Sequence, residues 1–528
     1  MSASIPREEA RAAARKAPTT GRTARSGPRV PRWLALLHRW LGIGMCLFFV
    51  MWFTSGIVMM FVPYPSLDPA ARYRGVPALD MRMVRLAPGD ALTRLGLHNQ
   101  TIERLILLPR PVGAASRHTA MDHPTYVIWS LHNRARVIDA ATGAILPLLE
   151  ADGARSQAER FAGGMARTVN GPSADDQWTV AQGYDPYRPL WRVDLADSAG
   201  SEVYVSAISG EIVLATTRME RIANYAGSVA HWIYPTLLRR YPGFWANTVW
   251  CLSGGGVVLA LSGMVLGILR SMISLRNMRR PQLSPFFRMH RLHHLLGLSA
   301  GLFLTTWIVS GWLSVDHGLI FPTGQPDADQ SRAYQGGSLE AAVGEIAISA
   351  LNRIAGPSAL RFTSVGGMTI VEGSDASGIR TTWNAHGDRL AFVPDVTLLH
   401  AAAAAWPLAR PMRVDAISPD DLYGHLIYQG LPEGAVRMRL GNIHGLPGST
   451  WVDVDRTSGA LLDVMDWRRR LYRWLFNGLH TFDVPGLNHH GVLRRLIMAP
   501  ILLAGLALSV TGIILGMKRL RVQPRRLR

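Results

Sequence analysis

Four long stretches of this 528-residue chain contain no Asp, Glu, Lys or Arg. They cover residues 40–67, 241–269, 292–315 and 496–517. Because a helix needs about 20 apolar residues to cross a bilayer, each stretch is long enough to span one. The first stretch is too long, and begins too far into the chain, to be a cleaved signal peptide. Two polar segments between the stretches, 64–221 and 316–470, are each as long as a soluble domain.

The net charge of +19 comes from three short segments next to the apolar stretches. Residues 1–39, 270–291 and 518–528 hold 21 basic and two acidic residues, and the rest of the chain is balanced. Basic residues mark the cytoplasmic side of a membrane protein, so both termini and the middle loop are expected in the cytoplasm of a bacterial cell. Both polar segments then face the periplasm. Since neither carries a basic patch, nucleic-acid binding is not expected.

The apolar stretches are repeated within the chain. At an offset of 255 residues, residues 37–57 align without gaps on residues 292–312, and 9 of the 21 positions are identical. This alignment places His38 on His293. The second and fourth stretches align at an offset of 249, which places His231 on His480. The chain therefore reads as two halves in the same orientation, related by a pseudo-twofold axis along the membrane normal.

These observations predict a membrane protein with an all-α core of four transmembrane helices and two α+β domains outside the membrane. The α+β prediction comes from alternating apolar and polar residues around Thr-Gly or Ser-Gly turns, as in 202–213 and 449–462. The predicted order is a basic cytoplasmic tail (1–32), helix 1 (33–63), the first outer domain (64–221), a His-bearing segment with helix 2 (222–270), a cytoplasmic loop (271–288), helix 3 (289–317), the second outer domain (318–472), a His-bearing segment with helix 4 (473–518) and a cytoplasmic tail (519–528).

The chain resembles the PepSY-associated transmembrane proteins, also called iron-regulated membrane proteins. Three features carry the resemblance: the Leu-His-x-x-Leu-Gly openings at Leu37 and Leu292, the strand units with Asp-x-x-Thr-Gly turns, and Leu479-His480 before the last apolar stretch. The resemblance covers roughly residues 33–520. It implies that both outer domains are PepSY-like. Similarity to the ferric-siderophore reductases of this family implies electron transfer through membrane haems to an iron chelate.

Four histidines are the main candidates for a functional site, because an ionisable side chain in a membrane segment is costly. Under twofold symmetry His38 and His293 face each other near the cytoplasmic side, and His231 and His480 near the outer side. Two neutral imidazoles can supply both axial ligands of one haem iron, so this arrangement predicts two b-type haems. Any one of these histidines alone is better explained as a polar residue near the lipid headgroups. Their placement in two symmetric pairs favours haem ligation.

Other polar residues close to the two pairs are alternatives or supporting groups. His317 or His490 could replace a member of the outer pair. His294 is an alternative to His293, but it aligns with Arg39 in the first copy, which argues against it. Three residues near the inner pair could contact the haem propionates: His290, Arg39 and Arg291. The two arginines are also explained as orientation determinants that contact anionic lipid.

The expected function is that of an inner-membrane haem oxidoreductase. It would pass electrons from the cytoplasmic side to Fe(III) in a periplasmic siderophore or similar chelate, and no catalytic residue is assigned. The chain has no Gly-x-Gly-x-x-Gly or P-loop motif for NAD, flavin or ATP, so the donor is a quinol or a cytoplasmic reductase. One alternative is a membrane-anchored PepSY binding module without redox activity. Another is a siderophore transporter, which would need a polar path that the uncharged stretches lack.

Overall fold

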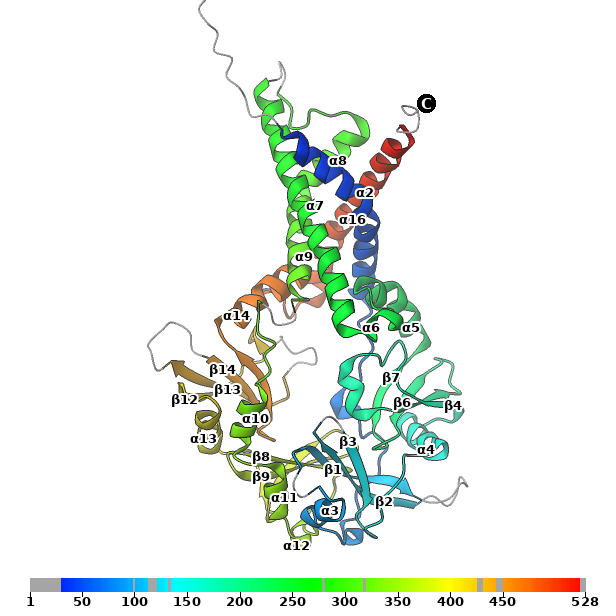
Figure 1. The fold of residues 1–528 in the computed structure, drawn as a ribbon, viewed down its shortest axis with the longest axis vertical. Helices are drawn as coiled ribbons and strands as arrows, with labels where there is room; N and C mark the ends of the chain where they lie inside the picture. Colours follow the sequence, from blue (N-terminus) through cyan, green and yellow to red (C-terminus); the bar gives the residue numbers. More distant parts are fainter. Residues whose placement is uncertain are drawn as a thin grey trace, which may run out of the picture.

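The computed structural model describes residues 30–97, 100–112, 121–131, 134–277, 281–316, 320–424, 431–442 and 450–522. The protein consists of a helical region and a sheet region, drawn above and below one another in Figure 1. We call the end of the helical region where α2 begins and α16 ends the terminal side, and the opposite end the sheet side. The helical region contains α2 (Arg32–Met59), α7 (Pro242–Asn277), α8 (Arg288–Ser299), α9 (Gly301–Leu313) and α16 (Gly491–Val522).

Three of the described helices, α2, α7 and α16, are each long and apolar enough to span a membrane. The fourth predicted span, 289–317, instead forms α8 and α9, which are bent by 61° relative to one another. The predicted four-helix transmembrane core, with equivalent halves about a pseudo-twofold axis, is therefore wrong.

The bend between α8 and α9 lies at a junction of small residues. The Ser299 hydroxyl donates to the carbonyl oxygens of Leu295 and Leu296 in the last turn of α8, a contact that weakens the regular backbone ladder. The next helix begins at Gly301, where a Cβ atom would lie 2.9 Å from Cε of Met264 on α7. Small residues at the junction thus let the chain turn while α9 stays in contact with α7.

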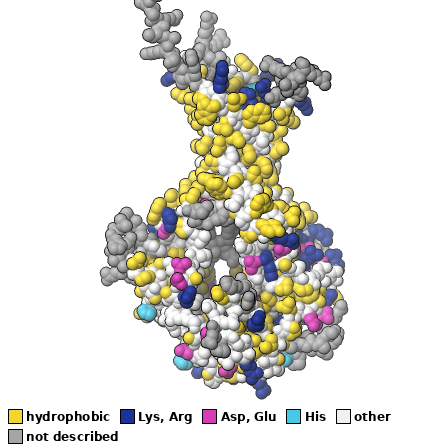
Figure 2. Space-filling view, in the orientation of Figure 1, with side chains coloured by type: hydrophobic (Ala, Val, Ile, Leu, Met, Phe, Trp, Pro, Cys, Tyr) yellow, Lys and Arg dark blue, Asp and Glu magenta, His cyan; other side chains and the backbone are white. Residues whose placement is uncertain are grey.

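Large apolar side chains form the core of the helical region. α2 packs against both α16 and α7, and α9 packs against α7. The outward faces of these helices are also apolar, and Figure 2 shows hydrophobic side chains covering this region. Helices that are apolar all round, at the surface of a protein, indicate a lipid environment. The buried core residues are Met45, Phe49, Phe53, Leu259, Ala260, Leu304, Trp307, Ile308 and Leu502.

The sheet region contains three antiparallel sheets. A seven-stranded sheet, in the order β11-β10-β9-β8-β1-β2-β3, joins strands from both polar segments because β1 pairs with β8. Its strands are β1 (Ile102–Val112), β2 (Met121–Ser130), β3 (Arg134–Asp139), β8 (Ala359–Val365), β9 (Met368–Ser374), β10 (Arg380–Asn384) and β11 (Arg389–Leu390). The boundaries predicted for the two outer domains stay a prediction.

The other two sheets have four strands each and connect the seven-stranded sheet to the helices (Figure 1). The first contains β4 (Ala166–Ser173), β5 (Leu190–Leu195), β6 (Glu202–Ser206) and β7 (Ile212–Thr216). The second contains β12 (Ala409–Ala416), β13 (Ala435–Asn442), β14 (Thr450–Asp455) and β15 (Leu461–Met465). Two of the predicted strand units form the hairpins β6–β7 and β14–β15, which turn at Gly210 and Gly459, both with positive φ.

Short helices pack on the sheets or connect them to the helical region. Those associated with the sheets are α3 (Pro88–Arg94), α4 (Ala151–Ala162), α10 (Ala328–Gln335), α11 (Leu339–Gly344), α12 (Ile348–Leu351) and α13 (Asp395–Ala405). The connecting segments contain α5 (Arg218–Asn224), the π-helical turn η4 (Tyr225–Val229) and α6 (Thr236–Arg239) in one half, and α14 (Trp467–Arg473), the π-helical turn η6 (Trp474–Gly478) and α15 (Leu479–Thr481) in the other.

Candidate metal centres

The first histidine pair lies on the terminal side of the helical region. His38 comes from the second turn of α2 and His293 from the second turn of α8. Their ring centroids are 6.4 Å apart, with an angle of 53° between the ring planes. The structure thus brings together two side chains that are 255 positions apart in the sequence. We call His38 and His293 the terminal-side pair.

The second histidine pair lies on the sheet side. His231 follows the π-helical turn η4, and His480 lies in α15, directly after η6. Their ring centroids are 6.3 Å apart, with an angle of 75° between the ring planes. We call His231 and His480 the sheet-side pair.

The two connecting segments position the sheet-side pair by the same local devices. α5 begins with a capping box between Thr217 and Glu220, and α14 begins with Asp466 accepting from the Arg469 amide. A π-helical turn then shifts the register before each histidine. Two residues after each histidine the backbone adopts the left-handed region, with φ 50° at Ile233 and φ 53° at Phe482. This conformation is rare for large side chains and persists only where surrounding structure holds it, as is common at functional sites.

Each of the four histidines contacts a hydroxyl group on a neighbouring helix through Nδ1. The Nδ1–Oγ distances are 3.3 Å for His38–Ser262, 2.8 Å for His293–Thr511, 3.0 Å for His231–Ser55 and 3.0 Å for His480–Ser310. Every one of these hydroxyls donates its own proton to a carbonyl of its own helix. This arrangement favours hydroxyl oxygens that accept from Nδ1–H, with the imidazole proton on Nδ1 and the lone pair on Nε2.

A glycine follows each of these hydroxyl residues and faces the edge of the same imidazole. A Cβ atom at Gly263 would lie 2.6 Å from Cε1 of His38, and one at Gly311 would lie 3.3 Å from Cε1 of His480. A Cβ atom at Gly56 would lie 3.6 Å from Cε1 of His231, and one at Gly512 would lie 3.7 Å from Cε1 of His293. The repeated Ser/Thr-Gly pair thus supplies a hydrogen-bond acceptor and the space for one ring.

Both pairs have the dimensions expected for two imidazoles on one metal ion. With metal–nitrogen bonds of about 2 Å on opposite sides of the metal, two imidazole centroids lie about 6 Å apart. Among the residues the structure describes, Nε2 of these four histidines has no hydrogen-bond partner. Metal-bound histidines commonly donate the other ring N–H to an oxygen, as these do. The ring spacing and the chemistry of the donor atoms are therefore compatible with two imidazoles binding one metal ion at each level.

Burial keeps the sheet-side imidazoles neutral. Loss of hydration lowers the pKa of His231 to about 3, and the neighbouring His480 contributes to the same shift. Burial likewise lowers the pKa of His480 to about 4. Since only the neutral ring has a lone pair to give, both histidines are in the form that binds a metal ion.

The other predicted site residues are not brought to an imidazole pair. His294 uses both ring nitrogens, Nδ1 with Ser284 (2.9 Å) and Nε2 with the Gly267 carbonyl (3.0 Å), which fixes the loop before α8 to α7. Four more are exposed: His490, Arg39, Arg291 and His290, whose ring centroid lies 6.3 Å from that of Phe286 with the ring planes tilted by 32°. His317 lies outside the described residues.

The four hydroxyls that contact the histidines were not predicted from the sequence. Their signal is present in the repeats: Ser55-Gly56 recurs as Ser310-Gly311 at an offset of 255, and Ser262-Gly263 recurs as Thr511-Gly512 at 249. Across the described residues, no cluster of three or more His, Cys, Asp or Glu side chains could hold a metal ion.

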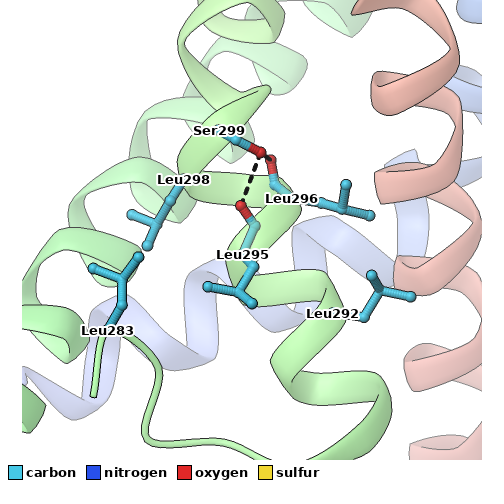
Figure 3. Close-up of a pocket in the computed structure, with 6 residues that line it drawn as sticks. All are labelled: Leu283, Leu292, Leu295, Leu296, Leu298 and Ser299. Atoms are coloured by element: carbon cyan, nitrogen blue, oxygen red, sulfur yellow. Dashed lines mark hydrogen bonds between the residues drawn. The ribbon is translucent and has the colours of Figure 1, made fainter. Parts of the chain in front are cut away.

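An apolar pocket of about 440 Å³ lies beside the bend between α8 and α9, shown in Figure 3. Its only polar lining residue, Ser299, already donates to the Leu295 carbonyl. A pocket with no free polar group has nothing to orient a substrate, so we do not treat it as an active site. The other lining residues are Leu283, Leu292, Leu295, Leu296 and Leu298.

Fold and site together define a membrane protein with several apolar helices, antiparallel sheets on one side and two facing histidine pairs. Comparison with known families identifies the group more closely. Residues 35–519 match the model of the PepSY-associated TM region, which covers most of the chain, so the protein belongs to this family. No curated protein matches the chain.

Proposed function

We propose that this protein is a haem-dependent oxidoreductase that carries electrons across the membrane to reduce a ferric chelate. In this proposal each histidine pair holds one b-type haem, and the membrane is the bacterial inner membrane with both termini in the cytoplasm. The observation that supports it most strongly is the repeated geometry: two pairs, with centroids 6.4 and 6.3 Å apart, in which every Nδ1 is occupied by a hydroxyl.

The chain's own residues would orient the ligands and exclude water. Ser262, Thr511, Ser55 and Ser310 would hold the proton at Nδ1 and leave Nε2 available to bind the metal. Haem bound there would supply one-electron chemistry. From His38 to Ser55, which contacts His231, α2 rises about 26 Å, so the two pairs divide the membrane crossing into shorter steps. The apolar core between them, including Phe49, Phe53 and Trp307, keeps the interval dry.

The proposed acceptor is Fe(III) in a siderophore or a similar chelate on the sheet side. One electron converts Fe(III) to Fe(II), with no bond made or broken in the protein. Because Fe(II) binds hard oxygen ligands less tightly, reduction releases the iron. The proposed electron donor on the terminal side is a quinol or a cytoplasmic reductase.

The decisive experiment is an optical spectrum of protein purified from haem-replete cells. The dithionite-reduced minus oxidised spectrum should show low-spin b-haem bands, with two haems per chain. The reduced protein should then be reoxidised by a ferric hydroxamate or catecholate chelate, with Fe(II) trapped by a coloured Fe(II) chelator. Protein without haem would overturn the proposal and favour a PepSY binding module. Haem-containing protein that is not reoxidised by any ferric chelate would overturn the assigned acceptor.

A further inference from the structure

The helices α5 and α14 have an unusual distribution of apolar residues. A helix on the surface of a water-soluble domain turns its apolar face inward and its polar face outward. Here the outward faces are apolar: Met219, Ile222 and Tyr225 in one half, and Trp467, Leu471 and Trp474 in the other, are between 38% and 71% exposed. Their spacings, i, i+3, i+6 and i, i+4, i+7, place each set on one side of its helix.

The inward faces of the same segments are polar and fully buried. Asn224 donates to the carbonyls of Pro63 and Glu220, and Ser228 donates to Asn224. At the equivalent place in the other half, Arg473 is buried, with Nε donating to the Leu422 carbonyl and Nη2 3.2 Å from Asp483. Both segments therefore use polar contacts toward the protein and leave their apolar side chains outside.

Both segments lie directly beside the sheet-side ends of the spanning helices, as Figure 1 shows. α5 and η4 pack against α2, and η6 packs against α9. The apolar surface continues through the connections into the spanning helices, with Phe61, Leu237, Tyr241, Phe244, Leu479 and Val492 all exposed. Aromatic and aliphatic side chains at this level are typical of a membrane–water interface.

We infer that α5 and α14 lie flat in the sheet-side lipid headgroup layer, with their outward apolar faces inserted between the lipids. Continuity with the spanning helices fixes the partner as the bilayer that surrounds them. The charge pattern of α14 agrees, since this helix contains four arginines and no acidic residue, and Arg468, which pairs with Asp466, is exposed beside Trp467. This placement sets the membrane depth of η4, η6 and the sheet-side pair. It holds whether or not the histidines bind haem.

The test uses nitroxide labels on the full-length protein in lipid nanodiscs, with Cys46 and Cys251 replaced by alanine. Single cysteines are introduced at Ile222 and Leu471, and as controls at Met165 and Val396, which are 72% and 73% exposed in the sheet region. Accessibility to oxygen, which partitions into lipid, is compared with accessibility to a water-soluble nickel chelate. The oxygen-to-nickel ratio at positions 222 and 471 should be several-fold higher than at 165 and 396.

Equal ratios at all four positions would overturn the inference. Labels at 222 and 471 that neither reagent reaches would indicate a protein partner and would also overturn it. A second measurement does not depend on labelling: Ile222→Asp combined with Leu471→Asp should lower the heat-unfolding midpoint in nanodiscs, whereas Met165→Asp combined with Val396→Asp should not. An unchanged midpoint in the first variant would contradict the lipid contact.

Discussion

The terminal-side and sheet-side pairs have the same ring spacing but are built differently. His38 and His293 lie within α2 and α8, so regular helix places them. His231 and His480 follow π-helical turns in the connecting segments, and each is followed by a residue at positive φ. One pair is therefore positioned by helices, of which α8 begins at Arg288 with a φ of 48°. The other also depends on the sheet region, because β7 and β15 lead directly into α5 and α14.

Removal of a ligand should have the largest effect. Under the proposed function, His293→Ala should abolish haem binding at the terminal-side pair and so remove about half of the total haem, since His38 alone would not hold the group. Haem content per chain is measured by difference spectroscopy. His290→Ala, a change three residues away on the same helix, is the control and should retain full haem. A full haem complement in His293→Ala would contradict the ligand assignment.

A glycine substitution should separate the two pairs. In Gly263→Ala the new Cβ would lie 2.6 Å from the His38 ring, so the imidazole must move and haem affinity should fall about 100-fold at the terminal-side pair. In the matched variant Gly56→Ala the new Cβ would lie 3.6 Å from His231, an ordinary contact, and affinity should be unchanged. Haem titration of apo-protein distinguishes the variants. Equal affinities would show that the ring positions are less constrained than the glycines indicate.

The hydroxyl contacts should have a smaller effect. Thr511→Val removes the 2.8 Å contact of His293 and should weaken haem binding about 10-fold. Ser262→Ala removes a longer contact of 3.3 Å, so its effect should be smaller still. A backbone hydrogen bond remains at each imidazole, from His38 to Leu259 and from His293 to Leu508. The midpoint potentials of the haem should shift in the same order. A larger loss in Ser262→Ala than in Thr511→Val would reverse the proposed ranking.

The pairing of the histidines was predictable because the two internal repeats align His38 with His293 and His231 with His480. The apolar stretches were also recognisable, but the number of straight spanning helices was not. A run of uncharged residues does not predict the 61° bend at the junction of Ser299 and Gly301. Composition predicts that a segment prefers lipid. It does not predict whether the segment crosses as one straight helix.

The sequence also predicts only part of the sheet region, because only some of its features have local signals. The hairpins β6–β7 and β14–β15 were predictable from alternation and from glycines at the turns, because these signals are local. The pairing of Leu105 in β1 with Phe362 in β8 joins strands more than 250 residues apart and has no local signal. The positive φ at Ile233 and Phe482 was likewise invisible, because neither residue type favours it.

The smallest expected effect on the histidine pairs comes from the sheet region. Glu211, in the turn before β7, is fully buried and ion-paired with Arg104 at 3.0 Å. Glu211→Gln leaves the arginine without its carboxylate and should reduce the free energy of unfolding of the sheet region by about 3 kcal/mol. This loss of stability is measured by heating the protein and using its protease sensitivity to follow unfolding of the sheet region. Glu103→Gln, an exposed change beside Arg104, is the control. Haem content at neutral pH should stay unchanged in both variants.

Acid should reveal the same contact in the native protein. Burial opposes ionisation of Glu211, but Arg104 and Arg72 outweigh it and hold the pKa of Glu211 below its usual value of 4.5. A carboxyl whose pKa is lowered by folding stabilises the folded protein at any pH above the pKa of the unfolded state. That stabilisation is lost as the pH falls through the pKa of the folded state. The stability difference between wild type and Glu211→Gln should therefore be full at neutral pH and shrink below pH 4.5.

Because α5 follows β7, haem loss on acidification should begin at the sheet-side pair. Haem loss that begins at the terminal-side pair would refute this dependence on the sheet region.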